Sequence, residues 1–134
     1  MINKKELRLG NYVMYEQTTH VVTAMSRILI ETEWDGGTEN YIHLPEELDP
    51  IPLTEEVLLK CGLTQKGSLF GIGFLDTIYW YHIENHTLYI EYTDSPFSED
   101  EGTRYPVSSP IKHLHVLMNA IYSLTGKELK YEKD

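Results

Sequence analysis

The segment TIYWYHIENHTLYIEYTD, residues 77–94, constrains the fold of this chain most strongly. Two runs of alternating aromatic and β-branched residues flank the polar sequence ENH, which is the pattern of a β-hairpin. We expect Tyr79, Tyr81, Tyr89 and Tyr92 to make aromatic contacts across this hairpin. A tyrosine ring is apolar while its hydroxyl stays hydrated, so the same four residues are our first binding candidates.

The N-terminal part of the chain has the pattern of a second, separate sheet. The runs YVMY, HVVTAM, ILIETEW and YIHL are divided by two to six polar or glycine residues. Short β-branched and aromatic runs at this spacing predict an antiparallel meander. We therefore assign residues 1–50 to a β-meander subdomain. A meander of this length commonly closes into an SH3-like barrel, although an open sheet fits the spacing equally well.

Residues 51–134 predict a mixed subdomain that shares one core with the meander. LPEELDPIPL holds three prolines and predicts an extended connector. TEEVLLKCG predicts a short helix that Thr54 caps and Gly62 ends. The glycine-punctuated sequence LTQKGSLFGIGF predicts a loop with a ragged strand, and SPFSEDEGTR an acidic loop. An amphipathic helix packed on sheet follows from Ser109 and Pro110 to Gly126, so the fold class is α+β.

The charge of the chain bears on its partners. It has 21 Asp and Glu against 11 Lys and Arg, a formal net charge of −10, which argues against direct nucleic-acid binding and favours a basic protein partner. Cys61 is the only cysteine, so it forms no intramolecular disulfide, and we expect it to be a buried thiol. No apolar run suggests a signal peptide or a membrane span, so we expect a cytoplasmic protein with no membrane contact.

Two pairs of histidines are the transition-metal candidates in the sequence, while the acidic loop with Asp94, Glu99, Asp100 and Glu101 lacks the ligand pattern of a calcium loop. Within a helix, His113 and His115 would point about 160° apart, on opposite margins of the apolar stripe, and could not share an ion. His82 and His86, with Glu84 as a third ligand, resemble a zinc motif, but the glutamate does not directly follow the first histidine. We therefore expect no metal, no cofactor and no catalytic residue, and retain His115 as a binding candidate.

Three blocks of the sequence resemble a known family. ELRLGNYV at 6–13, IPLTEEVLLKCGL at 51–63 and IKHLHVLMNAIYSLTGKEL at 111–129 are similar to an uncharacterised family of small proteins from gut Bacteroidetes genomes and their phage-like mobile elements. The resemblance implies residence in mobile DNA and cytoplasmic expression, and it supplies no activity and no catalytic residues. Within that family the histidine matching His115 recurs, which favours His115 over His113.

These observations rank three classes of function. A non-enzymatic accessory or protein-binding protein of mobile-element origin comes first, because no reactive constellation appears while aromatic side chains and an acidic surface do. A small metal-dependent hydrolase that uses His82, His86 or His115 with carboxylates is the second class. An acidic mimic of nucleic acid is the third, and it requires carboxylates arrayed along one surface.

Overall fold

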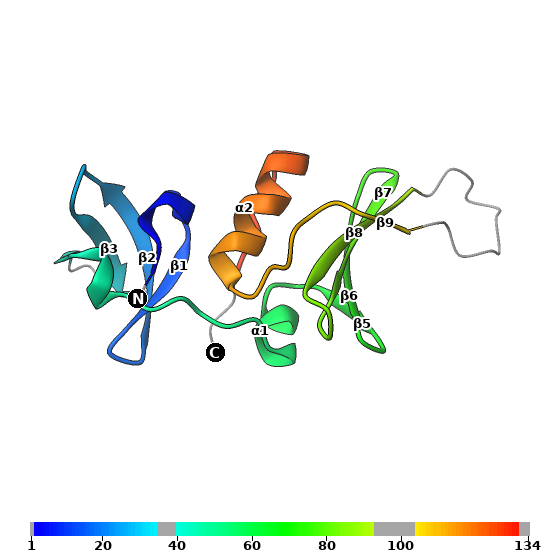
Figure 1. The fold of residues 1–134 in the computed structure, drawn as a ribbon, viewed down its shortest axis with the longest axis horizontal. Helices are drawn as coiled ribbons and strands as arrows, with labels where there is room; N and C mark the ends of the chain where they lie inside the picture. The colour runs from blue at the N-terminus through cyan, green and yellow to red at the C-terminus, as the bar shows by residue number, and fades with distance from the viewer. Residues whose placement is uncertain (1, 35–39, 93–103, 132–134) are drawn as a thin grey trace. The chain divides into compact units, whose positions relative to one another are not determined.

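The computed structural model describes residues 2–34, 40–92 and 104–131 (Figure 1). The chain divides into two compact units. Unit 1 contains residues 1–52 and 113–119, and unit 2 contains residues 53–112 and 120–134. The sequence placed all of residues 51–134 in one subdomain, whereas contacts group 113–119 with the N-terminal part. The predicted acidic loop lies outside the described residues.

Unit 1 is built on a four-stranded antiparallel sheet of order β1-β2-β3-β4. Its elements are η1 (Lys4–Glu6), β1 (Tyr12–Tyr15), β2 (Thr18–Met25), β3 (Ile30–Trp34), β4 (Asn40–His43) and η2 (Pro45–Glu47). Each strand pairs with the next in the chain, so the predicted meander is confirmed. The apolar core of this unit comprises Ile2, Leu7, Val13, Val22, Ile30 and Leu48.

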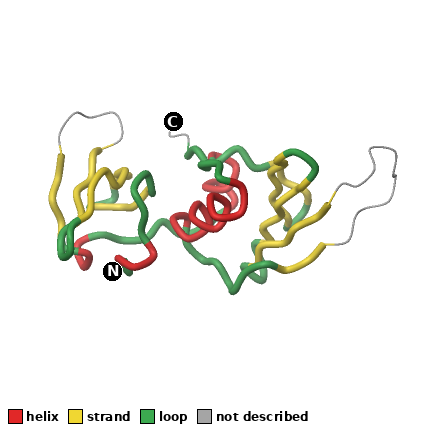
Figure 2. The backbone as a smooth tube through the Cα atoms, turned by 90° about the horizontal axis from the view of Figure 1, so that it is seen from above, coloured by secondary structure: helices red, strands yellow, loops and turns green. Residues whose placement is uncertain are grey.

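Unit 2 is built on a five-stranded antiparallel sheet of order β5-β6-β7-β8-β9. Its elements are α1 (Glu55–Lys60), β5 (Thr64–Lys66), β6 (Leu69–Phe74), β7 (Thr77–His82), β8 (Thr87–Tyr92) and β9 (Arg104–Pro106). Strands β7 and β8 are the predicted hairpin. The two sheets and the helices together confirm an α+β fold with a high strand content, and Figure 2 colours the strands yellow and the helices red.

Residues 63–74, predicted as a loop with a ragged strand, form the β5–β6 hairpin, so the strand is confirmed and the loop is wrong except at the turn. Gly67 lies in the turn with φ +63°, a conformation that glycine adopts without steric cost. Gly71 lies opposite Trp80, and a Cβ added at Gly71 would come within 2.6 Å of the indole ring. This glycine therefore marks a close packing contact inside a strand and no break in it.

The short helix α1 forms as predicted. The hydroxyl of Thr54 accepts a hydrogen bond from the backbone N–H of Val57 at 3.2 Å, which satisfies one of the free donors at the helix start. Gly62 follows the helix with φ +84°. Cys61 is buried beside it, and burial raises the pKa of its thiol to about 12.

The last helix, α2 (Leu114–Thr125), begins later than the sequence predicts. Residues 111–113 are extended, and His113 forms a β-bridge with Pro52. The N–H of Leu114 donates to the carbonyl of Ile51 at 2.8 Å. These contacts with the connector near residue 52 replace the first helical turn. The end at Gly126, with φ +73°, is as predicted. No helix in the described ranges is long and apolar enough to cross a membrane.

Candidate functional site

A hollow of about 300 Å³ opens at one end of the sheet in unit 1, and we call it the aromatic pocket. Its lining residues are Tyr15, Glu16, Thr18, His20, Trp34 and Tyr41. The register places Tyr15 opposite Thr18 and His20 opposite Trp34. Directly opposed residues in an antiparallel pair point to the same face of the sheet. The consecutive strands of the meander thus bring three large aromatic side chains together.

His20 is the buried residue at the floor of the aromatic pocket, and it belongs to a chain of three buried polar side chains. The hydroxyl of Thr32 lies 3.0 Å from Nδ1 of His20 and 2.9 Å from Nε2 of His43. The hydroxyl carries a single proton, so one imidazole donates to it while the other accepts from it. Burial lowers the pKa of His43, against an opposing effect of the Glu47 carboxylate. Neutral imidazoles satisfy the two bonds to Thr32, while Nδ1 of His43 is buried without a hydrogen-bond partner in the described structure.

The rings of the pocket contact each other with well-defined geometry. Tyr15 and Tyr41 approach His20 with centroid distances of 5.7 Å and 5.3 Å and interplanar angles of 87° and 77°. Tyr15 also lies 4.4 Å from His43. Edge-on arrangements at these distances are favourable for aromatic pairs. The two histidine rings therefore pack against both tyrosine rings and fix their positions. Trp34, in contrast, remains 47% exposed.

The rim of the pocket carries negative charge on a strained turn. Glu16 and Gln17 join β1 to β2 with φ values of 48° and 67°. A two-residue hairpin turn with positive φ at both positions usually contains asparagine or glycine, so these side chains carry a steric cost. The nearby Glu16 charge is the main cause that raises the pKa of the Tyr15 hydroxyl, with burial and Glu47 adding to it. The electrostatic potential at this rim is therefore negative.

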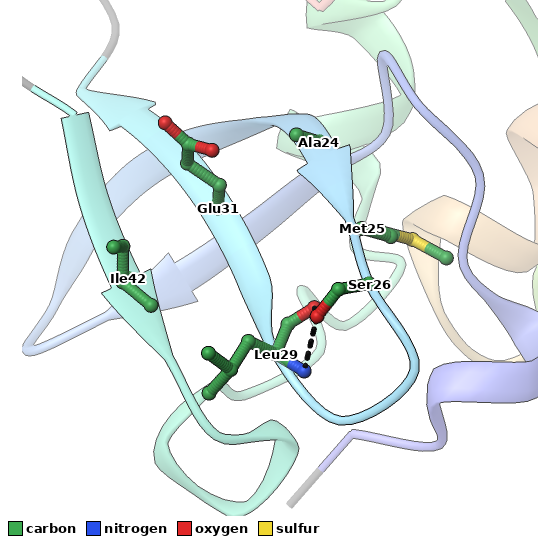
Figure 3. Close-up of a pocket in the computed structure, with 6 residues that line it drawn as sticks. All are labelled: Ala24, Met25, Ser26, Leu29, Glu31 and Ile42. Atoms are coloured by element: carbon green, nitrogen blue, oxygen red, sulfur yellow. Dashed lines mark hydrogen bonds between the residues drawn. The ribbon is translucent and has the colours of Figure 1, made fainter.

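A second, shallower hollow of about 180 Å³ lies on the opposite face of the same sheet, and we call it the outer hollow (Figure 3). Its lining residues are Ala24, Met25, Ser26, Leu29, Glu31 and Ile42. Ala24, Glu31 and Ile42 are register neighbours on three adjacent strands. The N–H of Leu29 donates to the hydroxyl of Ser26 at 3.1 Å and closes the turn beside them. Ile42 is 66% exposed, so this hollow is open and largely apolar.

The four tyrosines predicted from the hairpin do not form one site. The register sets Tyr79 opposite Ile90, Tyr81 opposite Leu88, Tyr89 opposite Trp80 and Tyr92 opposite Thr77. The register therefore opposes one of these tyrosines, Tyr89, to another aromatic residue, Trp80, and it pairs none of the four tyrosines directly with another. Tyr79 and Tyr81 are buried, Tyr89 is half-buried, and Tyr92 is 53% exposed.

Tyr81 has an internal role in unit 2. Its hydroxyl donates to the carbonyl of Ile111 at 2.5 Å and lies 3.1 Å from Nδ1 of His86. Burial raises the pKa of Tyr81 to about 12. Because its side chain is fully buried, it offers no surface to a partner.

His115 is buried in unit 1, and its ring stacks on that of His113 with centroids 6.0 Å apart and an interplanar angle of 5°. The prediction that the two rings point away from each other is wrong, because His113 precedes the helix. Burial lowers the pKa of His115 to about 4; the Glu6 carboxylate, 3.9 Å from Nε2, opposes this, and His113 adds to it.

The histidines that flank the β7–β8 turn bond to neighbouring groups. Nδ1 of His82 accepts from the backbone N–H groups of Glu84 and Asn85, and Glu84 accepts from Ser68. His86 contacts Tyr81, as described above. Within the described ranges, no group of three or more His, Cys, Asp or Glu side chains is placed to hold a metal ion.

Comparisons with protein-family models, with curated proteins and with solved structures give no match to this chain. The aromatic pocket is not among the sites predicted from the sequence, although its signal is present there. The four residues that mark it each lie next to a predicted turn: Tyr15, His20, Trp34 and Tyr41. In an up-and-down meander, the first and third turns lie at the same end of the sheet.

Proposed function

We propose that this chain is a non-enzymatic accessory protein that binds a basic protein partner through the sheet of unit 1. One observation carries the proposal: both faces of this sheet have an open hollow lined by apolar side chains, and each hollow has one carboxylate in its lining, Glu16 or Glu31. An apolar side chain flanked by a cation fits either hollow. The formal net charge of −10 favours the same class of partner.

The exposed apolar side chains of unit 1 supply a driving force for such binding. Trp34, Ile42, Leu44 and Ile28 all retain at least two-fifths of their side-chain exposure. Covering apolar surface gains roughly 25 cal/mol per Å², so a partner that buries these side chains gains affinity. Charge attraction adds mainly to the association rate and is screened by salt.

An SH3-like closure of this sheet is part of the proposal. After η2 the chain returns to the first strand, where Met14 and Asp49 exchange backbone hydrogen bonds of 2.9 Å and 2.8 Å. This return supports a curved, partly closed sheet, since it adds a pairing partner at the β1 edge. The origin in mobile DNA that the three sequence blocks indicate also belongs to the proposal, and the neighbouring genes would test it.

The test is a binding titration of the full chain with fluorescent peptides of equal length. The peptides share one apolar side chain and differ only in net charge: basic, neutral or acidic. We expect the basic peptide to bind most tightly and its affinity to fall with added salt. Trp34→Ala and Ile42→Ser should each weaken binding, because both side chains are exposed and their loss spares the core.

Tyr92→Ala is the matched control, since Tyr92 is similarly exposed but lies in unit 2. It should leave the affinity unchanged. Affinity that is independent of peptide charge, or that survives both unit 1 substitutions, would refute the proposed function.

A further inference from the structure

We infer that the aromatic pocket binds a fully alkylated ammonium group, the head group of a methylated lysine in the partner. This inference rests on the proposed function and specifies the ligand of one of its two hollows. A free quaternary ammonium compound has the same chemistry, and the experiment below separates the two sources.

The walls of the pocket suit an organic cation. Tyr15, Trp34 and Tyr41 contribute three aromatic side chains to one hollow, and among the described residues its lining holds no lysine or arginine. The face of an aromatic ring carries partial negative charge and attracts a cation within about 6 Å of its centroid. Indole and phenol give the strongest such attraction among the aromatic side chains. Three of them around one open hollow would surround a cationic group that enters it.

The rim adds long-range attraction to these contacts. Glu16 lines the pocket, and the charges of Glu16 and Glu47 both act on the Tyr15 hydroxyl. The Glu16 carboxylate belongs to the pocket lining and Glu47 acts on Tyr15 from outside it, so both charges attract a cation. The strained turn at Glu16 and Gln17 holds the first of these charges at the pocket. Backbone strain of this kind is more frequent at functional sites than elsewhere.

The floor distinguishes an alkylated from a primary ammonium group. A primary ammonium has three N–H donors and loses free energy if they enter a pocket without acceptors. Of the buried polar side chains in the described ranges, only His20 lines the pocket, and its Nδ1 is already engaged by the Thr32 hydroxyl at 3.0 Å. The ring faces of Tyr15, Trp34 and Tyr41, which form the rest of the apolar lining, offer no lone pair to an N–H group. A trimethylammonium group has no N–H to satisfy and is weakly hydrated. The pocket therefore favours the alkylated cation over the primary one.

The test compares three peptides of identical sequence that differ at one side chain: trimethyl-lysine, unmodified lysine, and a neutral isostere in which carbon replaces the charged nitrogen. All are titrated into the full chain. We expect the trimethyl-lysine peptide to bind at least about fivefold more tightly than either of the others, since the cation–π contribution disappears with the charge. Its N-methyl proton resonances should shift upfield on binding, as expected for a group held against ring faces.

Variants and a small-molecule arm complete the experiment. Trp34→Ala should remove the preference for trimethyl-lysine, Trp34→Phe should retain part of it, and Tyr92→Ala in unit 2 should leave it intact. Tetramethylammonium is added alone and as a competitor. Competition with the peptide supports the shared pocket, while tetramethylammonium binding with no preference among the peptides would assign the pocket to a free small molecule and overturn the inference.

The peptide titration distinguishes a failure of the methyl-lysine inference from a failure of the proposed function. If the unmodified or an arginine peptide binds as tightly as trimethyl-lysine, the basic partner stands and the alkylated ligand is refuted. Equal binding of the neutral isostere would show an apolar pocket without cation recognition. If no peptide binds under any condition, both proposals fall.

Discussion

Acidification should destabilise this protein through His115. Its side chain is 1% exposed, and neither ring nitrogen forms a hydrogen bond in the described structure. Burial lowers the pKa of the folded state to about 4 from an ordinary value of 6.5. The unfolded chain therefore takes up this proton first as the pH falls. The stability that the neutral ring contributes is complete above pH 6.5 and is lost progressively down to about pH 4.

The size of this effect follows from the difference between the two pKa values. A pKa difference of about 2.5, at about 1.4 kcal/mol per pKa unit, gives an upper limit of roughly 3–4 kcal/mol, and residual screening by solvent reduces it to roughly 2–3 kcal/mol. The assay is urea unfolding of the native chain and of His115→Leu at pH 7 and pH 4, followed by tryptophan fluorescence. The native chain should lose roughly 2–3 kcal/mol more than the variant on acidification.

The comparison reports on His115 together with its coupling to Glu6 and His113, because the remaining ionisable groups are the same in both proteins. His43, whose pKa burial also lowers, contributes equally to the two curves. Identical pH dependence of the two proteins would refute the reasoning, since it would show that His115 has the same proton affinity in the folded and unfolded chains. A gain of stability on acidification relative to the variant would show that the Glu6 carboxylate outweighs burial.

Three further predictions follow from packing and burial. Gly71→Ala should cost about 1–3 kcal/mol in urea unfolding, because the new Cβ meets the Trp80 ring at 2.6 Å, while Gly73→Ala, whose Cβ has its nearest contact at 4.0 Å, should cost less than about 1 kcal/mol. Cys61 should react with a thiol reagent at pH 8 only after unfolding, since burial raises its pKa to about 12. Asn119→Ala should cost roughly 2 kcal/mol in the same unfolding assay, because it removes hydrogen bonds to three N-terminal residues.

The local sequence pattern was sufficient to predict an element whose formation depends only on its own residues. The β7–β8 hairpin follows from alternation on either side of a polar break, and α1 follows from Thr54 and Gly62 at its ends. The start of α2 depends on residues about sixty positions earlier, because the backbone N–H of Leu114 donates a hydrogen bond to the carbonyl of Ile51. A helix-start pair at Ser109 and Pro110 contains no information about that partner. Its local preference is overridden by tertiary contacts.

Glycine has two structural roles in the β5–β6 hairpin, and the sequence alone does not distinguish them. At Gly67 it permits a turn, and at Gly71 it makes room for the indole of Trp80. Both glycines favoured a loop in the sequence-based prediction, because glycine in a short segment usually indicates a turn or the end of an element. The second role depends on which residue lies across the sheet, and this register is fixed by strand pairing over the whole hairpin.

The aromatic pocket depends on register in the same way. Tyr15, His20, Trp34 and Tyr41 are unremarkable one at a time, and each fits an ordinary half-buried strand position. They meet because the β1–β2 pairing aligns Tyr15 with Thr18 and the β2–β3 pairing aligns His20 with Trp34. A slip of one residue in either pairing would send alternate side chains to the other face. The turn at Glu16 and Gln17, which fixes the first pairing despite its strain, therefore determines the pocket as much as the residues that line it.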